Sequence, residues 1–96
     1  MLIKAGVDIS RLRPEIRKKL NTIAGIVDAI FGDEIVITST FEGNHSPGSL
    51  HYANLAVDIR RGKKPLNIRN EIKRGLGPDY DVIEYETHFH IEYDPK

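Results

Sequence analysis

The chain of 96 residues contains no cysteine and carries no net charge, because 14 Lys and Arg residues balance 14 Asp and Glu residues. The absence of cysteine excludes a disulfide framework, a thiol nucleophile and a metal site built on thiolates. No apolar run approaches the roughly 20 residues that a membrane-spanning helix requires, and the N-terminus becomes polar too soon for a secretory signal. We therefore expect a chain synthesised in the cytoplasm without a membrane span, in which any metal is held by histidine and carboxylate groups.

The composition predicts one folded domain over residues 1–96. Hydrophobic residues make up 40% of the chain and charged residues 29%, which is typical of a globular protein. Apolar spacing predicts a helix over 16–31, with Pro14 at its first turn and Gly32 at its end, and a second helix over 65–75 that stops at Gly75. Strands are predicted over 34–40 and 55–59. We expect an α+β fold in which a small antiparallel sheet carries helices on one face.

Apart from Thr87, the end of the chain alternates between apolar residues at odd positions and polar residues at even positions from 83 to 93. A single straight strand would separate Glu84 from His90 by about 20 Å at roughly 3.3 Å per residue. A hairpin that turns near Thr87 pairs Ile83 with Ile91 and sets Glu84 opposite His90, at about 5 Å. We favour the hairpin because a strand of this length is unusual in so small a domain.

Histidine and carboxylate residues gather in four segments, which contain His45, then His51 with Asp58, then Glu84, then His88 with His90. Two imidazoles and one carboxylate form a suitable ligand set for a catalytic zinc ion, with the fourth position left for water. In a strand, both rings of a His-x-His pair project to the same face. Surface histidines are also common by chance, so the pattern alone leaves metal binding open.

The motifs around these residues resemble a known family. Residues 49–58 read Ser-Leu-His-Tyr-Ala-Asn-Leu-Ala-Val-Asp, which is similar to the Ser-x-His-x-x-Gly-x-Ala-x-Asp motif of the D-Ala-D-Ala metallopeptidases, the M15 or LAS group. Residues 84–90 resemble the Glu…His-x-His ending of the same superfamily. In its sequence segments the chain is most similar to the hedgehog signalling domain, which carries comparable segments in the same order. Asn54 stands at the family's Gly position, and asparagine tolerates a positive φ there.

The resemblance implies a Zn²⁺ ion held by His51, Asp58 and His90. It also implies that Glu84 is the general base on the zinc-bound water and that His88 contacts the oxyanion or orients the glutamate. Ser49 would bind substrate, unless its hydroxyl bonds only the loop backbone. The implied activity is that of a monomeric zinc peptidase that hydrolyses peptidoglycan peptides containing D-amino acids.

Several alternatives remain open at this point. A hedgehog-like zinc-binding interaction module with little hydrolytic activity would have the same motifs. His45 is either a further contact to the site or a solvated loop residue, and Glu86 is a rival base if the hairpin register differs. No Lys or Arg occurs between Lys19 and Arg60, whereas the carboxypeptidases resembled use an upstream arginine to engage substrate.

A basic block is followed by an acidic one near the end of the chain. Residues 60–74 hold seven Lys or Arg and one Glu, and residues 75–96 hold six carboxylates and one Lys. We interpret the basic block as a solvated helix face or a surface attracted to anionic cell-wall polymers, and we expect no nucleic-acid partner because the domain is neutral overall and lacks a recognised motif.

Overall fold

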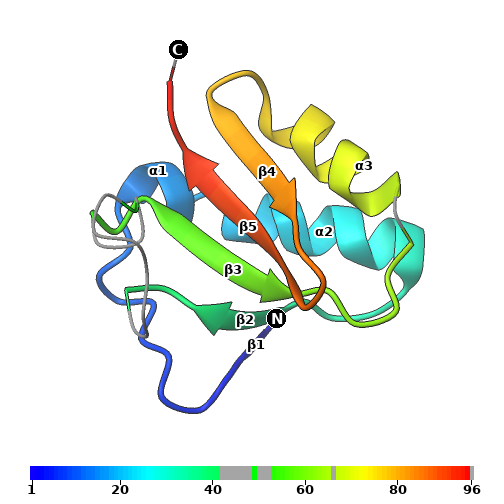
Figure 1. The fold of residues 1–96 in the computed structure, drawn as a ribbon, viewed down its shortest axis with the longest axis horizontal. Helices are drawn as coiled ribbons and strands as arrows, with labels where there is room; N and C mark the ends of the chain where they lie inside the picture. Colours follow the sequence, from blue (N-terminus) through cyan, green and yellow to red (C-terminus); the bar gives the residue numbers. More distant parts are fainter. Residues whose placement is uncertain (42–48, 50–52, 66, 96) are drawn as a thin grey trace.

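The computed structural model describes residues 1–41, 49, 53–65 and 67–95. These residues form an α+β fold with a five-stranded sheet in the order β1-β2-β3-β5-β4, as Figure 1 shows. The elements are β1 (Leu2–Ile3), α1 (Pro14–Arg17), α2 (Leu20–Phe31), β2 (Val36–Ser39), β3 (Ala56–Arg60), α3 (Asn67–Leu76), β4 (Tyr80–Glu84) and β5 (His88–Tyr93). The expected fold class and the helices on one face of the sheet are confirmed.

The sheet is mixed, because β1 pairs with β2 in parallel while the other described pairings are antiparallel. The expectation of a wholly antiparallel sheet is therefore wrong at this edge. Two residues are too few to show an alternating pattern, so the sequence carries no signal for β1.

The first predicted helix is divided into two pieces. The Lys19 N–H bonds to the Ile16 carbonyl at 3.0 Å, a tighter i to i−3 link that separates α1 from α2. Pro14 lies at the first turn as expected. Gly32 ends α2 in the left-handed conformation at φ 78°, where its N–H bonds to the Asp28 carbonyl at 2.9 Å.

The second predicted helix ends beyond Gly75, which therefore does not stop it. Gly75 lies inside α3, where this helix packs against α2, and a Cβ at this position would collide with the Ile26 side chain. The left-handed residue after the helix is Gly77, at φ 95°. Gly75 thus permits the close approach of the two helices.

The two faces of the sheet differ sharply in chemistry. Cross-strand neighbours on the helix side are fully buried, as with Val57 opposite Ile91 and Ile59 opposite Phe89. The described core is completed by residues from the three helices, from β2 and β4, and from the segments just before α1 and β2: Leu12, Ile16, Leu20, Ile23, Val27, Ile35, Ile37, Ile68, Ile72, Leu76, Tyr80 and Val82. No described helix lies over the opposite face, which we call the open face (Figure 1).

The outer edge of β4 is covered by basic side chains from α3. Arg69 Nε donates to the Val82 carbonyl at 2.8 Å, and Lys73 Nζ donates to the Tyr80 carbonyl. These contacts occupy backbone acceptors that would otherwise be available for pairing with another strand. The helix thus protects the sheet edge with residues of the basic block.

Candidate metal site

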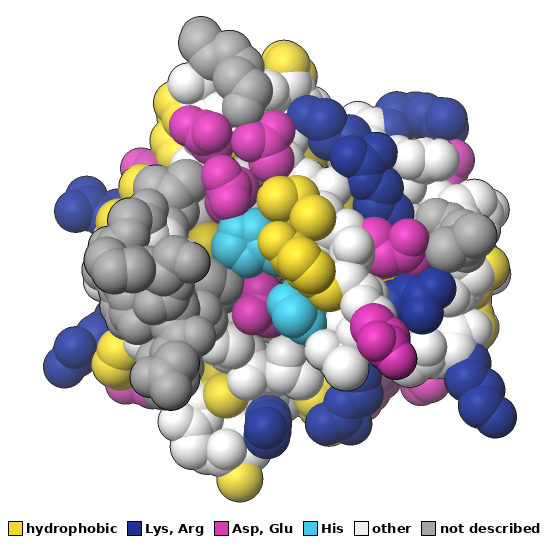
Figure 2. Space-filling view, viewed as in Figure 1, with side chains coloured by type: hydrophobic (Ala, Val, Ile, Leu, Met, Phe, Trp, Pro, Cys, Tyr) yellow, Lys and Arg dark blue, Asp and Glu magenta, His cyan; other side chains and the backbone are white. Residues whose placement is uncertain are grey.

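The open face of β3 and β5 carries the candidate site. In the ladder, Asp58 lies opposite His90, Arg60 opposite His88 and Ala56 opposite Glu92. Residues two apart on a strand share a face, so these polar side chains form two adjacent rows. Figure 2 shows histidine side chains in the middle of this surface, next to carboxylates and a hydrophobic patch.

Asp58 and His90 form the centre of this site. Asp58 Oδ1 lies 3.1 Å from His90 Nδ1, and the two side chains are only 10% and 12% exposed. Two ligand atoms that each lie about 2.0–2.1 Å from a tetrahedral zinc ion are separated by roughly 3.3 Å. The spacing of this pair therefore fits a shared zinc ion, and the oxygen and nitrogen donors are those that zinc accepts.

A β-bulge accompanies Asp58 on its other side. The β2–β3 register shifts between the pairs Ile37 with Ile59 and Ser39 with Asp58, and the Thr38 hydroxyl donates to the Asp58 carbonyl at 3.4 Å. Bulges bend a strand and redirect side chains, and they are frequent beside functional sites. This irregularity was not predicted from the residue pattern.

His88 lies beside the pair and is more accessible. Its Nε2 is 3.8 Å from Asp58 Oδ2, and its side chain is 31% exposed. Its Nδ1 is 2.9 Å from the Thr87 hydroxyl oxygen, and its ring stacks on Tyr85 with centroids 4.8 Å apart. His88 therefore lies beside Asp58 on this face, and its role at a metal stays a prediction.

Glu92 contacts the far side of the His90 ring. Its Oε1 lies 2.6 Å from His90 Nε2, so the imidazole is held between two carboxylates. Burial opposes the charged imidazolium, but the hydrogen bonds to Asp58 and Glu92 and their charges outweigh it and raise the pKa of His90 above its usual 6.5. In the metal-free protein His90 therefore retains a proton to higher pH than an exposed histidine.

Glu84 does not lie where the sequence predicted it. The hairpin is present and turns before His88, but Glu84 pairs with Phe89, and His90 pairs with Ile83. The predicted register is wrong by one residue, and one step turns a side chain to the other face. Glu84 therefore shares the helix-side face with buried Phe89, while Ile83 lies on the open face and is 41% exposed.

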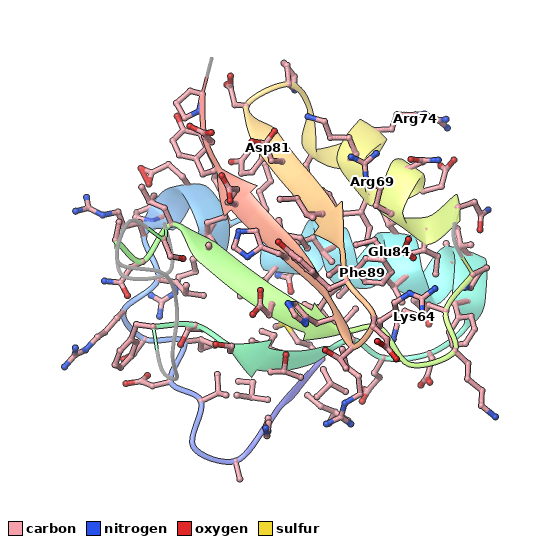
Figure 3. The ribbon with its side chains drawn as sticks, in the orientation of Figure 1. Lys64, Arg69, Arg74, Asp81, Glu84 and Phe89 are labelled. Atoms are coloured by element: carbon pink, nitrogen blue, oxygen red, sulfur yellow. The ribbon has the colours of Figure 1, made fainter. Side chains whose placement is uncertain are left out.

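The partner of Glu84 is Arg61 rather than a histidine of the site. Arg61 Nε donates to Glu84 Oε2 at 2.9 Å, and the two side chains are 25% and 29% exposed. Figure 3 labels Glu84 on the α3 side of the hairpin, near Lys64. The alternation of this segment favoured the wrong register because it matches Ile83 with Ile91, whereas in the structure Ile91 pairs with Val82 and Ile83 pairs with His90.

A second cluster of possible ligands was not singled out from the sequence. One carboxylate oxygen from each of Asp81, Glu92 and Asp94 lies within 4.8 Å of the others, and all three residues are half-buried. Exposed acidic groups often gather without an ion. The signal available beforehand was the acidic character of residues 75–96.

For three of the expected site residues the structure describes few contacts or none. His51, the expected third ligand, and His45 lie outside the described residues, so their contacts stay predictions. Ser49 is described as half-buried, and its substrate-binding role also stays a prediction. Asn54 adopts a positive φ of 61°, which agrees with the expectation for the turn before β3.

Much of the basic block is engaged within the fold. The contacts of Arg69, Lys73 and Arg61 are described above. Lys64 is also engaged, because it is only 8% exposed and donates to the Arg60 carbonyl at 3.0 Å. Desolvation lowers the pKa of Lys64. The interpretation of this block as a solvated helix face is therefore wrong for these residues, which link α3 and its preceding loop to the sheet.

A comparison with models of known protein families finds no match for this chain. Across the described residues, the helices are too short or too polar to traverse a bilayer.

Proposed function

We propose that this chain is a zinc-dependent peptidase domain in which Asp58 and His90 are two of the metal ligands and His51 is the third. The observation that supports this proposal is the 3.1 Å separation between Asp58 Oδ1 and His90 Nδ1 on the open face. A zinc ion bound there would polarise a substrate carbonyl and lower the pKa of its own water.

His88 is the group that we assign to proton transfer. It lies on the same face as the ligand pair, 3.8 Å from Asp58 Oδ2, and is accessible to a substrate. A neutral imidazole can accept a proton from an attacking water and return it to the leaving amine. Glu84 lies on the other face with Arg61, so this arrangement favours His88 over the glutamate that the motif predicted.

The proposed substrates are peptidoglycan peptides that contain D-amino acids. This substrate class follows from the resemblance of residues 49–58 and 84–90 to the D-Ala-D-Ala metallopeptidases. Two neutral histidines, one aspartate and Zn²⁺ carry a formal charge of +1, which favours an anionic tetrahedral intermediate.

A hedgehog-like zinc-binding module with little hydrolytic activity is the second candidate. The placement of Glu84 favours it, because a carboxylate base on the opposite face cannot reach a metal-bound water. The motif resemblance is equally compatible with this function.

The decisive experiment measures zinc content and hydrolysis on the same samples. We expect about one zinc per chain in the wild type and loss of zinc in Asp58→Ala and His90→Ala. The wild type should release new amino groups from muropeptides. His88→Ala should reduce this release while the variant retains zinc. Zinc without hydrolysis of free or cross-linked muropeptides would favour the interaction module. A native protein that binds no zinc would contradict both functions.

A further inference from the structure

His90 is held by a different carboxylate at each of its two ring nitrogens. Asp58 Oδ1 is 3.1 Å from Nδ1, and Glu92 Oε1 is 2.6 Å from Nε2. The ring is 12% exposed, Asp58 10% and Glu92 17%, so these contacts are largely shielded from water. The two nitrogens are therefore distinguished by their partners.

The identity of those partners assigns a role to each nitrogen. Asp58 is the proposed second ligand, so the Nδ1 side of the ring faces the metal position. An ionised carboxylate only accepts hydrogen bonds, which means that Glu92 requires a proton on Nε2. Asp58 can accept from Nδ1 in the same way in the metal-free protein, so a metal ion held by Asp58 would replace the proton on Nδ1 while Glu92 retains the proton on Nε2.

We infer that Glu92 is a positioning residue that makes Nδ1 the metal-binding nitrogen of His90. This inference rests on the proposed zinc site. Metal-bound histidines commonly donate their second ring N–H to a carboxylate, which fixes the tautomer and strengthens the ligand. The ladder supports the geometry, because Glu92 is two residues from His90 on the same face of β5 and lies opposite Ala56, next to the pair of Asp58 and His90.

Charge alone is a competing explanation, because Glu92 also belongs to the acidic cluster with Asp81 and Asp94. Any of these carboxylates would attract a cation to this end of the face. Asp81 is paired with Glu92 in the β4–β5 ladder and has no hydrogen bond to His90 among those that the structure gives. Asp81→Asn is therefore a matched control that removes one charge of the cluster and retains the His90 contact.

The experiment measures zinc affinity by chelator competition in the wild type, Glu92→Gln, Glu92→Ala and Asp81→Asn. Loss of such an outer carboxylate typically weakens metal binding by about 10- to 100-fold. We expect this loss in both Glu92 variants and a change below about 3-fold in Asp81→Asn. Equal losses in Asp81→Asn and Glu92→Gln would overturn the inference and leave the zinc site intact.

A second measurement identifies the ligating nitrogen directly. Long-range ¹⁵N–¹H NMR of the zinc-loaded wild type should show His90 with a protonated Nε2 and a metal-bound Nδ1. Ligation through Nε2 would overturn the inference even if the protein binds zinc and hydrolyses peptides. Absence of zinc binding in a folded wild type would overturn the proposed function, and this inference with it. Backbone amide spectra of each variant confirm that the fold is retained.

Discussion

The ion pair between Glu84 and Arg61 provides a direct test of the hairpin register. Glu84→Gln keeps a hydrogen-bond acceptor but removes the charge that faces Arg61 Nε at 2.9 Å. Exposed ion pairs contribute roughly 0.2–1 kcal/mol, and hydrogen bonds to charged groups about 1.5–3 kcal/mol. Because both side chains are about a quarter exposed, we expect a loss of about 1 kcal/mol in the free energy of unfolding.

This loss corresponds to a fall in Tm of about 4–8 °C for a domain of this size. Arg61→Gln should lower Tm by a similar amount, and the double variant should lose little more than either single variant. Zinc affinity should be unchanged in all three, since neither side chain is on the face that carries Asp58 and His90. Thermal unfolding and chelator competition measure these quantities.

The rate of hydrolysis by Glu84→Gln distinguishes a structural ion pair with Arg61 from a catalytic role for Glu84. A general base typically contributes about 10²- to 10⁴-fold to the rate, so its removal would reduce hydrolysis by that factor. We expect Glu84→Gln to retain at least about a tenth of the wild-type rate. A loss beyond ~100-fold with Tm unchanged and zinc retained would refute our reasoning and restore Glu84 as the base.

Three further predictions concern protonation, the sheet edge and the turn before β3. In protein freed of metal, the raised pKa of His90 stabilises the fold at low pH; this contribution is complete below the unfolded value of 6.5 and is lost as pH rises through the folded pKa. Urea unfolding from pH 5.5 to 8 with an NMR titration of His90 checks this, and a contribution that grows with pH would contradict it. Arg69→Ala leaves the Val82 carbonyl without its 2.8 Å donor. This should lower the free energy of unfolding in urea by about 1–3 kcal/mol and increase self-association measured by gel filtration. Arg69→Lys should restore part of the stability and part of the monomeric state. At Asn54, with φ 61° and a buried unpaired Oδ1, glycine should be neutral or stabilising, whereas alanine should lower the free energy of unfolding by about 1–2 kcal/mol; equal effects of the two substitutions would contradict this.

The elements with strong local signals were predictable. Pro14 and Gly32 marked the ends of the first helical region, although the tight bond between Lys19 and Ile16 that divides it has no clear signature in the sequence. In residues 55–59 the alternating pattern places Val57 and Ile59 on one face of a strand and Asp58 on the other, and the structure packs the first two in the core. These features depend on neighbours in the chain, and periodicity reports them well.

The candidate site was predictable in composition but only partly in geometry. The proximity of Asp58 and His90 agrees with the motif, and both lie on the open face. The contact of Glu92 with His90 at 2.6 Å was not predicted from the sequence. Cross-strand distances of this kind depend on register, and a shift of one residue exchanges the faces of every side chain on a strand.

The sequence by itself determined that any metal site must use histidine and carboxylate groups, that the chain forms an α+β domain, and that polar residues share one face of β5. Only the tertiary structure decided which carboxylate meets which histidine. It turned Glu84 toward Arg61, because Val82 and Ile91 pair in the core and their burial fixes the hairpin register. Burial of that apolar pair, rather than the polar motif, therefore determined the chemistry available on the open face.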